Sequence, residues 1–489
     1  MNKLLNELEL NYLLINSTNK FLVEYPELSE NARYTLTGFT GSTGDALITN
    51  DNIYLFVDGR YHIQADLEAN NNVTVVKLQI GQNQDDEIRK LIDPDKVLGI
   101  VGTKVSQARL ETFKRYNIKL LEVDPINNYS EPHTKEYIKS FEPVYYAPEA
   151  TFITNLEEVS YLTGLRDFSK DNTAKIWSKL FINGKERILF NNDDDCNEFL
   201  SNYDGELIVD KNTINAHDYA LIKKPVHRSS EIKMMMSVKS DEELEAYKKA
   251  FERTDMAVNS IRDYIENNNG LSEYDISLKL KEEFIKYGAK SLSFNSIVAI
   301  NQNSAQAHYA KNSKDVILRD GDLVLIDCGA YYESGLATDI TRVFVKGTPN
   351  ELQKRVYTTV LKAFLNCFNS DFKTGIEYDT FAHSLLDNAI EGFKFNHGLG
   401  HGIGINVHEA PPNLSQNEIA ETEIKNGMCF TIEPGLYNPN CFGVRLENSC
   451  YKKDGKIVSF AKIGYEKKLI NYNLLNEQEK KWLSNFNVL

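Results

Sequence analysis

The stretch on which the fold assignment turns is Asn396-His397-Gly398-Leu399-Gly400-His401-Gly402-Ile403-Gly404-Ile405-Asn406-Val407-His408-Glu409. It holds three of the nine histidines of the chain within twelve positions, interleaved with four glycines. A helix would align His397 and His401 one turn apart as metal ligands, but each glycine weakens a helix by about 1 kcal/mol relative to alanine. The stretch is therefore predicted to be a loop or an irregular strand that passes close to another segment and points its imidazoles at a ligand. A solvated glycine-rich loop with incidental histidines is the alternative, and the flanking sequence decides between the two.

Upstream of this stretch, two apolar segments each carry one acid. Residues 321–329 read as a buried strand that ends in Asp327, and residues 336–345 read as a second strand that holds Asp339. A hairpin with its turn around residues 333–335 would bring these carboxylates side by side. Two carboxylates that close repel each other unless a proton or a cation lies between them.

Downstream of the stretch, the same pattern repeats. Residues 428–435 form a predicted strand that ends in Glu433, and residues 442–448 form another that carries Glu447. Four strand-borne carboxylates and one imidazole, that of His401, are a suitable ligand set for two divalent ions about 3.5–4 Å apart, with Mn²⁺, Co²⁺ or Zn²⁺ as candidates. Each acid alone is common at a strand end or a helix cap. Four of them flanking a histidine-rich loop argue for a metal site.

The order Asp327, Asp339, His401, Glu433, Glu447 resembles the five-ligand signature of the pita-bread metallopeptidases, a family that contains methionine aminopeptidase, prolidase, aminopeptidase P and creatinase. The local phrases around these ligands fit as well: Ile326-Asp327-Cys328-Gly329, Thr338-Asp339-Ile340-Thr341-Arg342, His397-Gly398-Leu399-Gly400-His401-Gly402, Ile432-Glu433-Pro434-Gly435 and Val444-Arg445-Leu446-Glu447. Near the N-terminus, Gly38-Phe39-Thr40-Gly41-Ser42 and Val57-Asp58-Gly59-Arg60-Tyr61 resemble the creatinase-type N-terminal domain of the aminopeptidase P members.

The resemblance implies roles for residues outside the ligand set. His308 corresponds to a histidine near the scissile carbonyl and the leaving proline, His397 to one that lines the substrate pocket, and His408 to one that steadies the tetrahedral intermediate. Arg445 corresponds to an arginine that orients a ligand carboxylate, and Glu433 to the catalytic base. The pair Asp327 and Asp339 departs from the family, because it spans twelve positions instead of eleven. The extra residue is placed in the Tyr331–Gly335 turn, since inside a strand it would turn one acid to the wrong face.

The implied fold class is α/β and α+β, with a C-terminal pita-bread catalytic domain preceded by two creatinase-type N-terminal α/β domains. The predicted ranges are 1–130, 143–235 and 236–489, with a linker around Pro132, Pro143 and Pro148. The elements predicted from local pattern are strands at 45–49, 53–57 and 97–101 and helices over 156–165, from a capping box at Ser240–Glu243 to about 267, and over 350–368. The acidic run 193–195 is predicted to be a solvated loop.

Composition limits the classes of partner. The 489 residues carry a net charge of −15, which disfavours nucleic acid and anionic membrane surfaces. No run of about 18 apolar residues and no signal peptide are found in the sequence. The six cysteines show no C-x-x-C spacing and are typical of reduced thiols in a cytoplasmic protein. The glycine run also lacks the register of a dinucleotide-binding motif.

The resemblance thus implies an enzyme, a Xaa-Pro aminopeptidase that releases any N-terminal residue linked to proline from peptides. It implies two divalent cations, with Mn²⁺ favoured and Zn²⁺ or Co²⁺ as alternatives, and a homodimer. Proteases that grip their substrate by strand pairing handle the X-Pro bond poorly, because this tertiary amide has no N–H. Two alternatives stay open: a prolidase that cleaves only Xaa-Pro dipeptides, and a non-catalytic scaffold that keeps the fold as a peptide-binding module.

Overall fold

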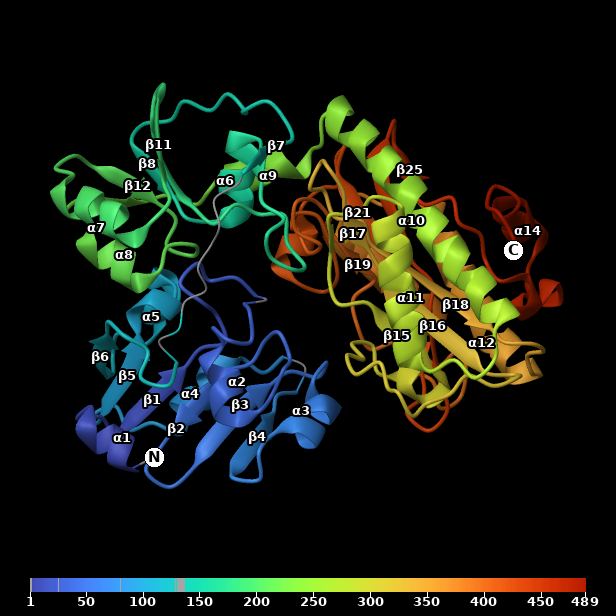
Figure 1. Cartoon of the computed structure of the whole chain (residues 1–489), viewed down its shortest axis with the longest axis horizontal. Coiled ribbons are helices and arrows are strands. Elements are labelled where there is room, and N and C mark those ends of the chain that lie inside the picture. The colour runs from blue at the N-terminus through green and yellow to red at the C-terminus, as the bar shows by residue number, and fades with distance from the viewer. Residues whose placement is uncertain (1, 25, 80, 128, 130–136) are drawn as a thin grey trace. The chain divides into compact units, whose positions relative to one another are not determined.

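The computed structural model of the chain describes residues 2–24, 26–79, 81–127, 129 and 137–489 (Figure 1). The chain folds into two compact units. The N-terminal unit consists of Met1–Lys135, Val144–Leu162 and Trp177–Ser230, and the C-terminal unit consists of Glu136–Pro143, Thr163–Ile176 and Glu231–Leu489. Of the three prolines in the predicted linker, Pro132 lies outside the described residues, and Pro143 and Pro148 lie in irregular segments. The three-domain division at 130, 143 and 235 stays a prediction.

The N-terminal unit contains a six-stranded mixed sheet with the strand order β4-β3-β2-β1-β5-β6. Its elements are α1 (Asn2–Glu7), β1 (Tyr12–Ile15), α2 (Ala32–Thr37), β2 (Ala46–Ile48), β3 (Ile53–Val57), α3 (His62–Glu68), β4 (Val73–Lys77), α4 (Gln84–Arg89), β5 (Val97–Val101), α5 (Gln107–Thr112) and β6 (Asn117–Leu121). Side chains alternate along the strands as a pleated sheet requires. Leu13 and Ile15 of β1 pack with Leu5 of α1 on one face, whereas Leu14 packs with Ile88 of α4 on the other.

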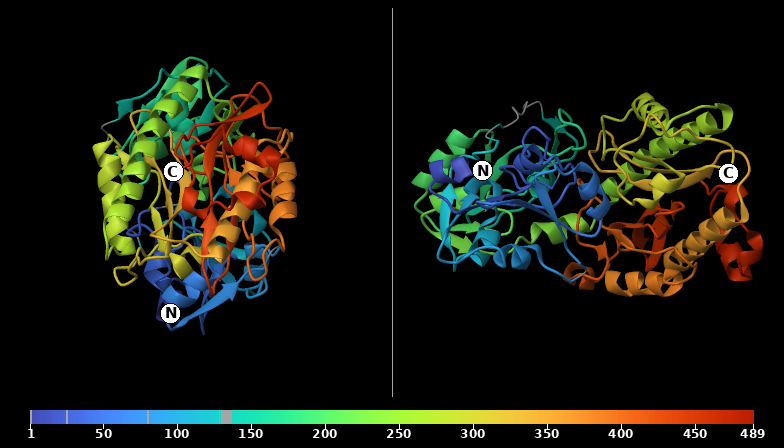
Figure 2. Two further views of the ribbon diagram at one scale, coloured as in Figure 1. Left: turned by 90° about the vertical axis from the view of Figure 1, so that its right-hand side faces the viewer. Right: turned by 90° about the horizontal axis from the view of Figure 1, so that it is seen from below.

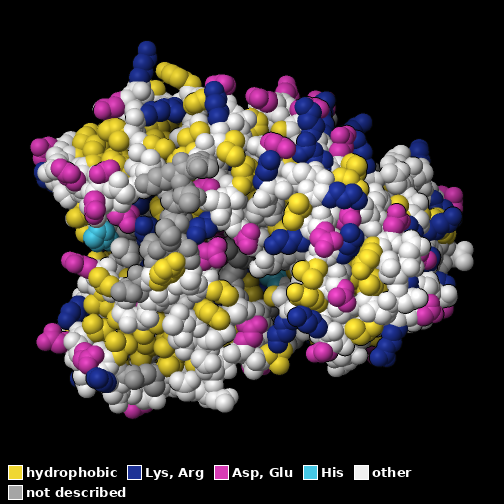
Figure 3. Space-filling view, viewed as in Figure 1, with side chains coloured by type: hydrophobic (Ala, Val, Ile, Leu, Met, Phe, Trp, Pro, Cys, Tyr) yellow, Lys and Arg dark blue, Asp and Glu magenta, His cyan; other side chains and the backbone are white. Residues whose placement is uncertain are grey.

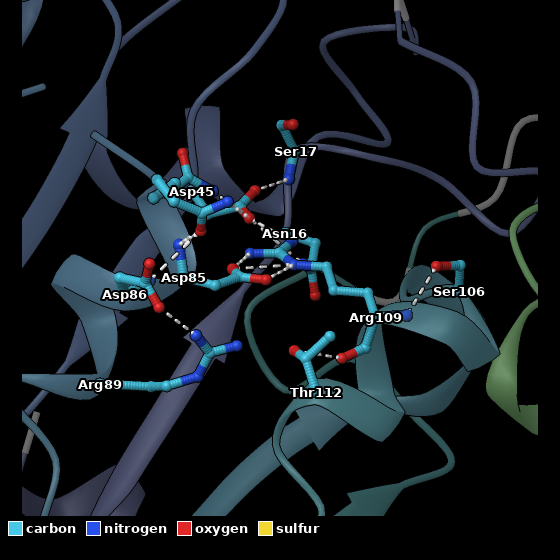
Figure 4. Close-up of polar contacts among 11 residues, drawn as sticks. Asn16, Ser17, Asp45, Asp85, Asp86, Arg89, Ser106, Arg109 and Thr112 are labelled. Atoms are coloured by element: carbon cyan, nitrogen blue, oxygen red, sulfur yellow. Dashed lines mark hydrogen bonds and ion pairs between the residues drawn. The ribbon is translucent and has the colours of Figure 1, made fainter. Parts of the chain in front are cut away.

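One arginine fixes α4 and α5 against this sheet (Figure 4). Arg109 of α5 lies 2.5 Å from an Asp45 carboxylate oxygen at the start of β2 and 2.5 Å from an Asp85 oxygen on α4. Asp45 is buried and also accepts a hydrogen bond from the Ser17 amide. Because both carboxylates stay paired, this cluster has a structural role in holding the two helices.

The same unit carries a five-stranded sheet with the order β11-β10-β8-β12-β13. Its elements are β8 (Thr151–Ile153), α6 (Leu156–Thr163), β10 (Lys179–Asn183), β11 (Glu186–Phe190), α7 (Asp193–Asn202), β12 (Leu207–Val209), α8 (Ala216–Leu221) and β13 (Pro225–His227). The loop predicted for residues 193–195 is wrong, since these three acids form the first turn of α7. Asn192 caps that helix, and acids in a first turn complement the helix dipole.

The C-terminal unit places strands between two pairs of helices, as both views in Figure 2 show. The pairs are α10 (Asp241–Asn267) with α11 (Glu273–Lys286), and α12 (Glu351–Phe368) with α13 (Gly375–Leu386). The predicted capping box is confirmed, because Ser240 accepts from the Glu243 amide and Glu243 accepts from the Ser240 amide. Val356, Val360 and Phe364 lie four residues apart on one face of α12, and all three are buried in one hydrophobic core cluster.

The remaining elements of this unit are mostly short. They are β7 (Ile138–Lys139), β9 (Leu165–Arg166), α9 (Ile232–Ser237), β14 (Ser291–Leu292), β15 (Ile297–Ile300), β16 (Leu323–Cys328), β17 (Ala330–Tyr331), β18 (Ile340–Val345), β19 (Gly400–His401), β20 (Asn413–Leu414), β21 (Cys429–Ile432), β22 (Gly435–Tyr437), β23 (Gly443–Arg445), β24 (Asn448–Lys453), β25 (Lys456–Ser459) and α14 (Glu477–Leu483). The sheet that matters for the site has the order β15-β16-β18, and β21 pairs with β24 in a second sheet.

Two short segments from the middle of the chain belong to the C-terminal unit. Strand β7 of the first segment pairs with β9 of the second. The hydroxyl of Ser140 donates to the Glu333 carbonyl oxygen, the side chain of Arg166 packs against Gly335, and the Asn172 amide donates to the Ser291 hydroxyl. These contacts brace the turn that separates β17 from β18.

On the face shown in Figure 3, acidic and basic side chains are interspersed over the surface. Among the described residues, no helix is both long and apolar enough to cross a membrane.

Candidate metal centre

The first two candidate ligands lie on one hairpin. Strands β16 and β18 are antiparallel, and the register pairs Asp327 with Thr341. Asp339 lies two residues before Thr341, so the pleat puts its side chain on the same face as that of Asp327. The same register continues unbroken to the bridge between Tyr331 and Ala337. The extra residue of this chain is therefore confined to the turn, as predicted, and neither acid changes face.

The second pair of acids lies on the other hairpin. The register of β21 with β24 pairs Ile432 with Asn448, and that of β22 with β23 pairs Gly435 with Arg445. Both registers place Glu433 directly opposite Glu447, at the junction between the two short ladders. Glu447 is 1% exposed, so its carboxylate is almost completely removed from water.

The histidine-rich stretch is irregular apart from the two-residue strand β19, as predicted, and it runs antiparallel to β21. The Ile403 amide donates to the Cys429 carbonyl oxygen, and the Glu433 amide donates to that of Leu399. A Cβ atom at Gly400 would collide with the Thr431 carbonyl oxygen, which explains why only glycine fits there. This pairing brings the imidazole of His401 beside the Glu433 side chain.

The two hairpins and the loop converge on one point. Nε2 of His401 lies 3.5 Å from an Asp339 carboxylate oxygen and 3.5 Å from a Glu433 oxygen. Ligand atoms of Asp339, His401 and Glu447 all lie within 4.8 Å of one another. The register of β16 with β18 puts Asp327 on the same face as Asp339, which places its carboxylate beside the cluster.

The electrostatics of this cluster fit bound cations. Burial, followed by repulsion from neighbouring carboxylates, raises the pKa of Asp339 and of Glu447 well above the ordinary values. Three buried carboxylate oxygens of this cluster have no hydrogen-bond partner among the described residues: Oδ1 of Asp327, Oδ1 of Asp339 and Oε1 of Glu447. Oxygen atoms without partners, together with one imidazole, are the donor set that divalent cations take.

Arg445 connects the cluster to a second layer of side chains. It lies 2.5 Å from an Asp327 carboxylate oxygen, and it donates to the Thr341 hydroxyl at 3.1 Å and to the Tyr437 hydroxyl at 2.8 Å. Thr341 in turn donates to a Glu447 carboxylate oxygen at 2.8 Å. Arg445 therefore holds Asp327 directly and Glu447 through Thr341, and it connects both to Tyr437.

The protonation of His397 follows from its two neighbours. Nδ1 lies 2.8 Å from the Gly398 carbonyl oxygen, which can only accept, so Nδ1 carries the proton. Nε2 is then the acceptor for the Tyr437 hydroxyl at 2.7 Å. Burial and the Arg445 charge lower the pKa of His397 to about 3, which keeps this imidazole neutral.

The other two predicted histidines lie around the same point. The ring of His408 meets that of His401 edge to face, with the ring centroids 4.3 Å apart. His308 follows the 3₁₀ helix at Asn301–Ala305, and its charge contributes to the lowered pKa of His397. Their roles in catalysis stay predictions.

Sequence reasoning missed several residues of this region. Side chains alternate between the two faces of a strand, so residues two or four positions apart lie on the same face. Thr341 lies two positions after Asp339, and Tyr437 lies four positions after Glu433, so this rule would have identified both. Asp379 of α13, whose carboxylate accepts from the Leu399 amide at 2.8 Å, carries no local signal, because its partner lies twenty residues away across the fold.

Comparisons with known proteins agree with this geometry. Residues 245–453 match Metallopeptidase family M24, and residues 1–128 match the creatinase/prolidase N-terminal domain. The chain is 26% identical over 576 residues to a probable Xaa-Pro aminopeptidase P of Laccaria bicolor, covering 99% of this chain and 88% of that relative. It is 38% identical over 221 residues to a Xaa-Pro dipeptidase of Pyrococcus horikoshii, covering 45% of this chain and 60% of that relative.

A solved structure extends the comparison to the fold. The X-prolyl aminopeptidase of Caenorhabditis elegans, a cytosolic enzyme with a di-nuclear active site, matches with a TM-score of 0.86 at 21% identity, over 97% of this chain and 90% of that one. The predicted fold class is therefore confirmed: N-terminal α/β structure of the creatinase type precedes a C-terminal pita-bread domain.

Proposed function

We propose that this protein is a cytoplasmic, metal-dependent Xaa-Pro aminopeptidase, because residues 245–453 match Metallopeptidase family M24 and residues 1–128 match the creatinase/prolidase N-terminal domain. The observation that carries the proposal is the convergence of Asp339, His401 and Glu447 within 4.8 Å of one another. The relative from Laccaria, which matches along nearly the whole chain, supports an aminopeptidase over other activities of the fold.

The residues that would hold two divalent cations are Asp327, Asp339, His401, Glu433 and Glu447. Mn²⁺ is the proposed metal, with Zn²⁺ or Co²⁺ as alternatives, since a set of four carboxylates and one imidazole accepts each of them. When bound, the cations polarise the scissile carbonyl and lower the pKa of the water that attacks it.

The protein side chains then divide the remaining work. Glu433 takes a proton from the attacking water and returns it to the proline nitrogen, whose bond to the carbonyl carbon breaks. His408 donates to the oxyanion that develops on the carbonyl oxygen. His308 lies on the side of the leaving proline, and His397, held by Tyr437, lines the pocket. The substrate's free α-amine is held near an acid of the cluster, which restricts cleavage to the first residue.

The test is release of the first residue from a tripeptide. Purified protein loaded with Mn²⁺ is expected to release arginine from Arg-Pro-Pro, and Glu433→Ala is expected to abolish the release because the proton acceptor is gone. Glu418→Ala, at an exposed position of the same unit, serves as the matched control and should keep full activity. Turnover that persists in Glu433→Ala would refute the assigned base.

A prolidase activity is the second candidate. The chain is 38% identical to the Pyrococcus dipeptidase over 221 residues, against 26% to the Laccaria aminopeptidase over 576 residues. Parallel assays on Arg-Pro and Arg-Pro-Pro separate the two. We expect the tripeptide to be preferred, and cleavage of the dipeptide alone would favour the prolidase. A homodimer remains part of the proposal and is tested by sedimentation of the same preparation.

A further inference from the structure

The carboxylate of Glu409 closes the histidine-rich loop on itself. Oε2 of Glu409 accepts from the Ile405 amide at 2.7 Å, and the Glu409 amide donates to the Gly402 carbonyl oxygen at 2.8 Å. The carboxylate also fills the space where a Cβ atom at Gly404 would stand. One side chain therefore fixes the backbone between His401 and His408.

A buried lysine from a distant part of the sequence holds this carboxylate. Nζ of Lys239 lies 2.5 Å from Oε1 of Glu409, and the two side chains are 3% and 8% exposed. Nζ also donates to the Met236 carbonyl oxygen. The lysine cation is therefore buried in direct contact with the Glu409 carboxylate.

The backbone of Lys239 is anchored as well. Its amide donates to the Gly427 carbonyl oxygen at 3.0 Å, and the neighbouring Val238 forms a bridge with Met428, directly before β21. Strand β21 leads to Glu433. Lys239 is therefore fixed to the strand that carries one candidate ligand and reaches with its side chain to the loop that carries His401 and His408.

Energetics favour a geometric role for this pair. Removing two charges from water is costly, and buried ion pairs often contribute no more to stability than well-packed apolar residues would. What an ion pair adds is a defined distance and direction between its partners. Here that direction sets the turn at residues 404–409, where the Asn406 side chain also donates to the His408 carbonyl oxygen at 3.0 Å.

We propose that Lys239 is a positioning residue of the active site. It holds Glu409, and through the Ile405 amide and the Gly402 carbonyl it sets the imidazole of His408 against that of His401. The inference rests on the proposed function for the role of His408, whereas the fixing of the loop is independent of it.

The experiment compares Lys239→Met with Lys179→Met. Lys179 forms a buried pair of the same kind with Asp218, 2.5 Å apart with side chains 6% and 3% exposed, in the N-terminal unit. Both variants remove the lysine that contacts one buried carboxylate. On Arg-Pro-Pro, with metal-loaded protein below its melting temperature, kcat of Lys239→Met is expected to fall about 10- to 100-fold at nearly constant KM, as for other residues that orient catalytic groups. Lys179→Met should keep its kcat.

A second readout does not depend on activity. In metal-free protein, hydrogen exchange in residues 401–409 should accelerate in Lys239→Met and stay unchanged in Lys179→Met. Lys239→Arg, which keeps the charge, should restore most of the protection and most of kcat.

Two results would overturn the proposal: a kcat in Lys239→Met no lower than in Lys179→Met, or unchanged exchange in residues 401–409. Should Lys239→Met fail to fold, Gly404→Ala provides the same test, because its methyl group displaces the Glu409 carboxylate while both charges remain. A wild-type protein without activity on Arg-Pro-Pro would contradict the proposed function, and the exchange data would still decide whether Lys239 fixes the loop.

Discussion

At the scale of single residues, the geometry of the site depends above all on the side chains that orient the candidate ligands through hydrogen bonds. Arg445 and Thr341 together make hydrogen bonds to Asp327, Glu447 and Tyr437. Each of these bonds replaces one that water would supply at an exposed carboxylate. One carboxylate oxygen on each of Asp327, Asp339 and Glu447 has no partner among the described residues, which leaves it available to a cation.

Thr341→Val tests this arrangement with almost no change of shape. The variant removes the hydroxyl that donates to Glu447 and accepts from Arg445. We expect kcat/KM on Arg-Pro-Pro and the affinity for Mn²⁺ to fall about 10- to 100-fold, as for other groups that orient ligands. Metal titration by calorimetry and steady-state kinetics measure both quantities. Thr359→Val on α12, which removes a hydroxyl bonded only to the Arg355 carbonyl oxygen, is the control and should change neither. Equal losses in the two variants would contradict the assignment.

The four candidate acids stand out in the sequence because each ends or interrupts an apolar strand, where a lone carboxylate is too costly to bury. Asp327 and Glu433 are examples. Lys239 and Asp379 could not be found, because nothing in their own helical or loop neighbourhoods distinguishes them. Their importance comes from contacts with residues 409 and 399, which only the folded chain brings near.

At the scale of elements, the pairing registers of the strands determine which side chains reach the site. Two hairpins and one loop bring the candidate ligands together, and each register fixes which face a side chain takes. Strand and helix positions followed from periodicity, as in β3 and α12. The prediction of a loop at the acidic first turn of α7 is wrong because it rests on the three charges alone and omits the helix cap Asn192.

Helix α10 is held in place by aromatic packing, since Tyr247 and Phe251 stack on Phe460.

Helix α10 also gives a prediction for how the stability of the protein depends on pH. Burial raises the pKa of Asp255 on α10 from 3.8 to about 6, although its carboxylate accepts from the Lys462 amide and the Arg342 charge opposes the shift. Between about pH 4 and pH 6 the folded protein binds a proton here that the unfolded chain has lost, so stability falls as the pH rises through this window. In Asp255→Asn this loss is absent.

We therefore expect the stability of Asp255→Asn relative to the wild type to increase by about 2 kcal/mol from pH 4.5 to pH 7.5. Melting temperatures of the metal-free proteins at the two pH values measure the change. Asp263→Asn, on an exposed side chain of the same helix, is the control for the substitution itself. A constant offset between Asp255→Asn and the wild type at both pH values would show that Asp255 does not titrate in this range.

At the scale of the whole molecule, the two compact units can be followed separately. The chain has two tryptophans, Trp177 in the N-terminal unit and Trp482 in the C-terminal unit. All candidate ligands lie in the C-terminal unit. A cation that binds only the folded site stabilises that unit by mass action, since the unfolded chain offers no assembled ligands.

Adding Mn²⁺ at about a hundred times its dissociation constant should stabilise the C-terminal unit by about 2.7 kcal/mol. In Trp177→Phe, where Trp482 is the remaining fluorophore, the melting temperature should rise accordingly. In Trp482→Phe, where Trp177 reports on the other unit, the rise should be smaller. An added Glu447→Gln should abolish the response, and an undiminished response in that variant would contradict the ligand assignment.

The segments 136–143 and 163–176 have a practical consequence for anyone who would dissect this enzyme. The C-terminal unit is not contiguous in sequence, so a fragment that starts near residue 236 would lack β7 and β9. It would also lack Ser140 and Asn172, which bond to Glu333 and Ser291. Such a truncation would expose the outer side of the turn that joins the two aspartate-bearing strands. The C-terminal unit therefore cannot be moved into another protein as one continuous segment. A fusion protein that contains it would also have to include segments 136–143 and 163–176.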